Sequence, residues 1–81
     1  MVLFDTQANY HMDTSGLSCP EPVMLLHGKI RGMVAGDLLA VVATDPATQR
    51  DIPNFCRFLG HELVGNVEQD NRFYYLIRKG K

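Results

Sequence analysis

The chain has 81 residues, of which 46% are hydrophobic and 21% are charged. This composition is typical of one compact globular domain rather than a disordered tail. A core of this size leaves little interior for an enclosed substrate cavity, so we expect any chemistry to lie at the surface. The formal net charge of −1 lacks the positive excess that phosphate backbones require, so we expect no direct, stable nucleic-acid binding.

Targeting signals are not recognisable in the sequence. The apolar runs are far shorter than the ~20 residues that cross a bilayer, and the first residues lack the basic and apolar regions of a secretory signal. We therefore expect a cytoplasmic protein that does not associate with membranes. We treat Cys19 and Cys56 as reduced thiols, because a single bridge is unusual in a domain with an adequate core and no export signal.

The chain begins with residues 1–9, which show no clear periodicity and which we expect to form a loosely held lead-in. We expect residues 10–81 to form a single domain. Residues 10–14 are rich in strand-compatible types and end at the turn signal Ser15-Gly16, which predicts the first strand.

A helix is predicted next, over residues 20–33. Pro20 and Pro22 suit its first turn, where backbone amides have no intrahelical partner to lose, and Gly36 lies beyond its end. Apolar residues at spacings of three and four form one stripe along it, namely Val23, Leu26, Ile30 and Met33.

Residues 38–44 are almost continuously apolar, which predicts a strand deep in a sheet. The following apolar stripe predicts a second helix over residues 48–59. Pro53 leaves two alternatives for its start: either the regular helix begins near Asp51 as its cap, or the first turn is irregular. The stripe consists of Ile52, Phe55, Cys56 and Leu59, before Gly60.

The last part of the chain predicts an antiparallel hairpin. Residues 61–68 and 72–79 flank the turn residues 69–71, and the second run alternates between apolar and polar positions. The predicted order is therefore βαβαββ, an α/β (α+β) fold in which two helices pack on one sheet as a two-layer sandwich.

The first two strands and the helix between them form a βαβ unit, whose strands are parallel. The segments after these strands, 17–22 and 45–50, should therefore meet at one end of the sheet, where ligands and chemistry collect in such folds. Asp45 there is expected to be a cap or turn residue. Arg50 either favours an anionic sulfur or is a solvated surface charge.

Cys19 stands where a strand passes into a helix. A helix N-terminus favours the thiolate and lowers a cysteine pKa from ~8.5 to between ~3.5 and ~7.5, so Cys19 is a candidate reactive thiol; the alternative is a small buried hydrophobe. Cys56 lies on an apolar stripe and is expected to pack in the core. The three histidines lack ligand spacing around either cysteine, so we expect no metal and no cofactor.

The first predicted helix has a second stripe of residues that does not belong to its apolar, core-facing stripe. It consists of Met24, His27 and Arg31, and Phe58 likewise lies off the stripe of the second helix. Methionine and aromatic groups beside arginine are typical of transient protein interfaces, so these four residues predict a partner-binding surface. The alternative is that they are ordinary exposed side chains.

Several sequence blocks resemble the TusA (SirA-like) sulfur-carrier family, over Met12 to Gly80. The general mark of that family is a CPxP sequence at a helix start, here residues 19–22. The narrower TusA pattern is resembled by residues 45–53 and by the FCxF sequence at 55–58. The closing residues 75–80 are similar to the same group.

The resemblance implies a mixed four-stranded sheet with two helices on one face and the last strand antiparallel to the others. It implies a cytoplasmic, sulfurtransferase-type carrier that accepts sulfur from a cysteine desulfurase as a persulfide on Cys19. A downstream acceptor protein would then pass the sulfur to the wobble uridine of tRNA for 2-thiolation. The residues that would support Cys19 are Pro20, Glu21, Pro22, Asp45 and Arg50.

Three alternatives to this function remain at the level of sequence. The first is a carrier that serves another sulfur pathway. A thiol redox protein would need a resolving cysteine, and Cys56 qualifies only if its Cα lies within about 7 Å of that of Cys19. A noncatalytic adaptor or regulatory binding module would use Cys19 only structurally, so its function should survive Cys19→Ser.

Overall fold

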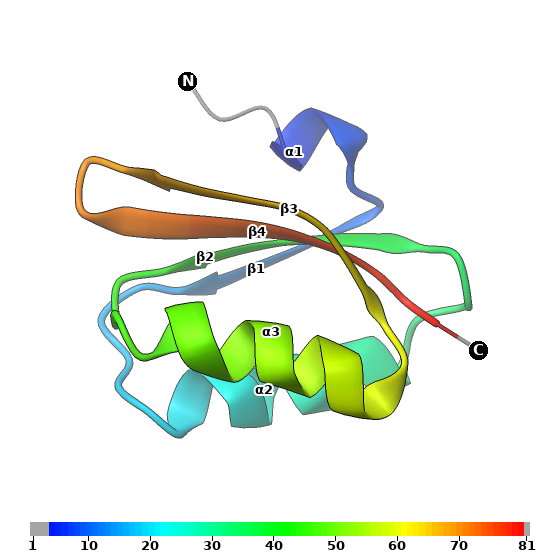
Figure 1. Cartoon of the computed structure of the whole chain (residues 1–81). Helices are drawn as coiled ribbons and strands as arrows, with labels where there is room; N and C mark the ends of the chain where they lie inside the picture. The colour runs from blue at the N-terminus through cyan, green and yellow to red at the C-terminus, as the bar shows by residue number, and fades with distance from the viewer. Residues whose placement is uncertain (1–3, 81) are drawn as a thin grey trace.

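The computed structural model describes residues 4–80. The four strands form one sheet, α2 and α3 cover one of its faces, and the short α1 lies on the other face (Figure 1). None of the helices within residues 4–80 has the length and apolar character needed to cross a membrane. The elements are α1 (Phe4–Gln7), β1 (Tyr10–Thr14), α2 (Glu21–Arg31), β2 (Leu38–Ala43), α3 (Thr48–Leu59), β3 (Glu62–Gln69) and β4 (Arg72–Arg78).

The strand order in the sheet is β1-β2-β4-β3. β1 pairs with β2 in parallel, and β4 runs antiparallel to both β2 and β3. The predicted fold class is therefore confirmed, including the antiparallel last strand. β2 lies between two other strands, as its continuous apolar sequence predicted.

The hairpin between β3 and β4 turns at Asp70 and Asn71, whose φ values are 55° and 63°. Two consecutive positive φ angles are typical of a type I′ turn, whose twist matches that of the flanking strands. Asp and Asn adopt this conformation more readily than most other residues. The predicted hairpin is confirmed: β3 lies one residue later than predicted, and β4 begins at the predicted residue and ends one residue earlier.

The core lies between the sheet and the two long helices. Leu26 and Ile30 of α2 are buried as predicted, and so is Met33, although α2 ends at Arg31 rather than at residue 33. Leu59 was predicted on the buried stripe of α3, but it is the last residue of the helix and is 45% exposed. The buried cluster also includes Leu39, Val41, Ile52, Phe55, Cys56, Phe73, Tyr75 and Ile77.

The start of α3 has an irregular first turn. The helix begins at Thr48 and continues through Pro53, so Asp51 is not its cap. The amides of Thr48, Gln49 and Arg50 donate to carbonyls three residues earlier, which is the hydrogen-bond pattern of a 3₁₀ turn. Of the two alternatives that Pro53 left open, the irregular turn is correct.

The lead-in contains a helix that the sequence did not predict. In α1, the Phe4 ring lies so close to Gly65 of β3 that a Cβ on this glycine would be 3.0 Å from it. α1 is a single turn, too short for its apolar residues to show helical periodicity. Residues 1–3 of the predicted lead-in lie outside the described part of the chain.

Candidate functional site

Cys19 lies on the loop between β1 and α2, at an exposed corner of the molecule. Its peptide bond to Pro20 is cis, and Pro20 is the N-cap residue of α2. Pro22 is buried at the start of the helix, whereas Glu21 is exposed. Cys19 therefore precedes the helix rather than belonging to its first turn, and its thiol is open to solvent.

The loop after β1 and the loop after β2 lie side by side at the same end of the sheet (Figure 1). The Cys19 amide donates to Asp45 Oδ2 at 2.6 Å. The Gly16 amide donates to Thr44 Oγ1 at 2.8 Å. These hydrogen bonds hold the two loops together and place Cys19 next to the start of α3, as the parallel crossover predicted.

Asp45 organises the turn that leads into α3. Its Oδ1 accepts the Ala47 amide at 3.0 Å, while its Oδ2 accepts the Cys19 amide. These two hydrogen bonds, that from Ala47 first, lower the pKa of the Asp45 carboxyl. The geometry fits the predicted turn role of Asp45, because both carboxylate oxygens bind backbone amides and neither binds the sulfur.

The side chain that contacts the sulfur is Asp51. The Cys19 thiol donates to Asp51 Oδ2 at 3.1 Å, and Arg50 Nε donates to Asp51 Oδ1 at 3.1 Å. Arg50 has no direct hydrogen bond to the sulfur among those of the described residues, and its side chain is 71% exposed. Sequence reasoning missed Asp51 as a site residue, because it considered this residue only as a helix cap. The signal that was overlooked is the position of Asp51, one turn into the helix that begins beside Cys19.

The carboxylates raise the pKa of the Cys19 thiol. The largest cause is the hydrogen bond to Asp51, which stabilises the protonated thiol, followed by partial desolvation and by the charges of Asp51 and Asp45; Arg50 opposes them. The same hydrogen bond, with that from Arg50, lowers the pKa of Asp51. The expectation that the helix N-terminus lowers the pKa of Cys19 is therefore wrong for this arrangement, in which the resting site is a thiol beside a carboxylate.

An apolar groove of about 410 Å³ lies beside Cys19, between α2 and α3. Phe58 lines it and is 81% exposed. His27 and Arg31 line a neighbouring hollow, and Phe55 lies between the two and contacts the His27 ring edge-on. Met24 is 66% exposed and lines neither. Of the four predicted partner-binding residues, Phe58 is the one that borders the groove containing Cys19.

Cys56 is separated from this site by its burial. It is 2% exposed and belongs to the core cluster, and burial raises the pKa of its thiol to about 11. Both cysteines are free. A buried thiol that is protonated at neutral pH is inert toward exchange, so Cys56 is not placed to resolve a disulfide with Cys19.

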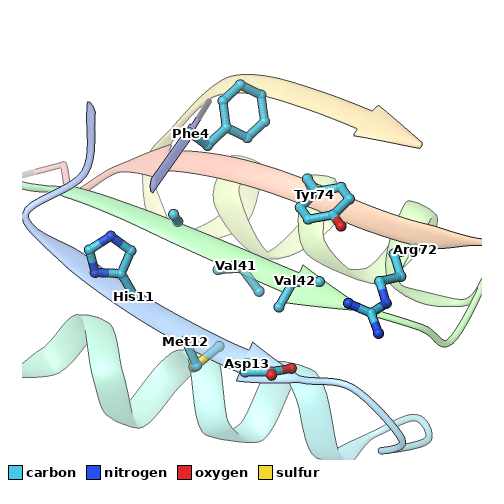
Figure 2. A pocket seen from close by; sticks show the side chains of 9 residues that line it. Phe4, His11, Met12, Asp13, Val41, Val42, Arg72 and Tyr74 are labelled. Atoms are coloured by element: carbon cyan, nitrogen blue, oxygen red, sulfur yellow. The ribbon is translucent and has the colours of Figure 1, made fainter. Parts of the chain in front are cut away.

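A second hollow, of about 380 Å³, lies on the sheet face opposite to α2 and α3. Figure 2 shows Phe4 at one end of it, with His11, Asp13, Arg72 and Tyr74 pointing from the strands. Arg72 is close enough to Asp13 to help lower the pKa of that carboxyl, after the hydrogen bonds from Ser15. Neither cysteine lines this hollow, and the candidate site is therefore at the end of the sheet where Cys19 lies.

Comparisons with known proteins show which family the chain belongs to. A family model described as "Sulfurtransferase TusA" matches residues 10–79. The chain belongs to the TusA family. Relatives named "Sulfur carrier protein TusA" in Pseudomonas paraeruginosa and Pseudomonas putida are each 59% identical over 68 residues, which cover 84% of this chain and 86% and 85% of theirs.

One solved structure supports the fold of the TusA family member described here. The crystal structure of a SirA-like protein from Desulfitobacterium hafniense matches with a TM-score of 0.77 over 89% of this chain and 99% of the other chain. The two sequences are 19% identical over the match, so this similarity concerns the fold alone.

Proposed function

We propose that this TusA family member is a cytoplasmic sulfur carrier. It accepts a sulfane sulfur from a cysteine desulfurase as a persulfide on Cys19 and delivers it to an acceptor protein in a relay that ends in 2-thiolation of the tRNA wobble uridine. The observation that carries the proposal is the exposed Cys19 thiol, which is hydrogen-bonded to the Asp51 carboxylate at a corner held by the hydrogen bond from the Cys19 amide to Asp45.

A carrier needs a reactive group that two different proteins can reach. Cys19 meets this requirement because it is exposed and borders an open groove rather than an enclosed cavity. Thiol exchange proceeds by attack of a sulfur nucleophile on a donor sulfur, and the corner supplies such a nucleophile together with an adjacent base. The names of the relatives, "Sulfur carrier protein TusA", support the same role.

The test is an intact-mass measurement after incubation with a cysteine desulfurase and cysteine. We expect one reductant-labile sulfur atom to be added to the wild-type protein and to Cys56→Ser, and none to Cys19→Ser. Loading of Cys19→Ser, or loss of loading in Cys56→Ser, would contradict the assignment of Cys19. A wild-type protein that never gains sulfur would contradict the carrier function itself.

The tRNA step has a separate test. Cells that lack the gene should contain less 2-thiouridine at the wobble position of their tRNA, and the wild-type gene should restore it. Cys19→Ser should fail to restore it. Unchanged 2-thiouridine in cells without the gene would instead assign the carrier to another sulfur pathway, and restoration by Cys19→Ser would favour the adaptor function.

We also propose that partners dock over the groove beside Cys19. Phe58 forms part of its lining, and Met24, His27 and Arg31 extend the exposed surface along α2. An exposed aromatic ring next to apolar groove walls is a typical anchor of a protein interface. The same surface would serve donor and acceptor in turn, since both must bring a sulfur atom to Cys19.

A further inference from the structure

We propose that Asp51 is the proton acceptor of Cys19 in the sulfur-transfer step. This inference rests on the proposed carrier function and assigns a catalytic role to a residue that the sequence did not single out. It starts from geometry, because Asp51 Oδ2 lies 3.1 Å from Cys19 Sγ. A nucleophile within hydrogen-bond reach of a base, with the base oriented by a third group, is the arrangement of nucleophilic catalysis.

The third group is Arg50. Its Nε donates to Asp51 Oδ1 at 3.1 Å, which leaves Oδ2 for the thiol. The hydrogen bonds to Asp51 keep this carboxyl ionised at neutral pH, because they lower its pKa. Asp51 is also the less exposed partner of the pair, with 20% of its side chain accessible against 71% for Arg50. The base is therefore charged, oriented and partly screened from water.

The neighbouring carboxylate has a different role. Both oxygens of Asp45 accept backbone amides, from Ala47 and Cys19, so this side chain fixes the loop and does not face the sulfur. The two aspartates near Cys19 therefore have different roles. Asp45 positions the backbone, and Asp51 contacts the reacting atom.

The chemical step balances without an external oxidant. Cys19 Sγ attacks the terminal sulfur of a donor persulfide, R–S–SH, and its proton passes to Asp51 as the new S–S bond forms. The S–S bond of the donor breaks, and the departing R–S⁻ takes the proton from Asp51. The Cys19 sulfur is oxidised from thiol to persulfide, while the donor sulfur is reduced to a thiol. A carboxylate is a weak base toward a thiol, so the proton moves with S–S bond formation rather than before it.

The same contact protects the resting carrier. While Asp51 holds the proton on Cys19, little thiolate is available to alkylating or oxidising agents, since the thiolate is the reactive form. Replacing Asp51 by Asn should therefore have opposite effects on two reactions of one sulfur. Alkylation, which needs only thiolate, should become faster, whereas sulfur loading, which needs the proton acceptor, should become slower.

The experiment compares wild type with Asp51→Asn, both in the Cys56→Ser background. At neutral pH we expect iodoacetamide to alkylate Asp51→Asn severalfold faster, with the pH midpoint of alkylation shifted downward. We expect loading from a small-molecule persulfide to be slower by about tenfold or more. At about pH 10, where thiolate forms without a base, the two loading rates should converge. Asp51→Glu, which keeps a carboxylate, should recover part of the loading rate.

The matched control is Asp70→Asn in the hairpin turn, which makes the same chemical change and the same change in net charge at a residue outside the hydrogen bonds that hold Cys19. It should leave alkylation and loading unchanged. Equal or faster loading of Asp51→Asn by the small persulfide would overturn the proposal, as would a loss confined to the desulfurase, which would assign Asp51 to docking. Failure of the proposed function is distinct, because wild type itself would then accept no sulfur.

Discussion

At the scale of single residues, the main finding is that the carboxylates around Cys19 raise its pKa, whereas the sequence predicted a lowered pKa at a helix N-terminus. A thiol at a helix N-terminus is expected to be acidic, but Cys19 lies one residue before the N-cap Pro20. Its sulfur faces Asp51 instead. The carboxylate hydrogen-bonded to the thiol stabilises its protonated form, so the pKa of Cys19 is raised.

Arg50→Ala is a test of this electrostatic balance. Arg50 is the group that lowers the pKa of Cys19 against the effect of the aspartates. Removing it should shift the pH midpoint of Cys19 alkylation upward and slow sulfur transfer. The free energy of unfolding should change by only ~0–1 kcal/mol, because the Arg50 side chain is 71% exposed. A midpoint that moves downward or stays constant would contradict this role of Arg50.

The two cysteines should also differ in their accessibility to reagents. At mildly alkaline pH, iodoacetamide should label Cys19 and leave Cys56 unlabelled, because Cys56 is 2% exposed and burial raises its pKa to about 11. Both should be labelled once urea unfolds the protein. Peptide mass spectrometry distinguishes the sites, and labelling of Cys56 in the folded state would show that the core opens at that point.

At the scale of elements, the site depends on how the start of α3 is fixed to the sheet. Thr48 is buried; its hydroxyl donates to the Asp45 carbonyl at 2.8 Å and lies 2.9 Å from the Tyr75 hydroxyl. A hydroxyl has one proton, so Tyr75 of β4 is the donor to Thr48. This chain of hydrogen bonds connects the middle of β4 to the turn that holds Cys19.

Substitutions at Thr48 and Tyr75 should lower the free energy of unfolding by different amounts. Thr48→Val removes the hydroxyl that donates to the Asp45 carbonyl and leaves the Tyr75 hydroxyl without its acceptor, and it should lower the free energy of unfolding by about 1–3 kcal/mol. Tyr75→Phe removes only one donor and should cost about 0.5–1.5 kcal/mol. Urea denaturation measures both, with the exposed Gln49→Ala as a control. A larger loss in Tyr75→Phe than in Thr48→Val would contradict the assigned direction of the bonds.

Substitution of Phe58 tests whether partners dock over the groove between α2 and α3. Since its side chain is 81% exposed, Phe58→Ala should change the free energy of unfolding by no more than about 0.5 kcal/mol. It should weaken desulfurase binding by about tenfold if the ring is an interface anchor. Val34→Ala is the control, because Val34 is 69% exposed but follows the other end of α2. A large loss of stability in Phe58→Ala, or equal binding of both variants, would remove Phe58 from the docking surface.

At the scale of the whole molecule, Gly80 after β4 packs against the loop that follows α3. The Gly80 amide donates to His61 Nδ1 at 2.9 Å. A Cβ on Gly80 would collide with the Gly60 carbonyl oxygen, so this close approach requires glycine. Burial, with the charges of Lys79 and His27, lowers the pKa of His61 below its ordinary value of 6.5. The folded state therefore favours neutral His61, which can accept this hydrogen bond.

This contact predicts a pH dependence of stability. Between the lowered pKa of folded His61 and 6.5, the unfolded chain binds more protons than the folded one, so stability falls as the pH falls through this window. Above 6.5 the contribution is fully present. Thermal unfolding at a series of pH values should give a lower midpoint at acidic pH, and His61→Asn, which accepts without titrating, should show a smaller decrease. An equal decrease in both proteins would contradict the role of His61.

The sequence by itself determined the order of the elements and most of the core. The apolar stripe of α2, the continuous apolar run of β2 and the alternation in β4 are local patterns, and each reports which face of an element is buried. The parallel crossover also placed Cys19 beside Asp45, because topology alone brings the ends of β1 and β2 together. The antiparallel hairpin followed from the short polar turn between two strands, whereas its type I′ geometry is seen in the structure.

Only the tertiary structure decided which side chain contacts the sulfur. Asp45 and Arg50 were expected near Cys19, whereas Asp51 was considered only as a helix cap. Which of these side chains points toward the sulfur depends on the geometry of the first turn of α3. That turn is irregular and is set by the buried contact between Thr48 and Tyr75, a pair 27 positions apart in the sequence. A shift of about 1 Å is enough to make or break a hydrogen bond. The periodicity of a sequence indicates only which face of an element is buried, so it does not resolve such a shift. The pKa of Cys19 was therefore beyond the reach of the sequence.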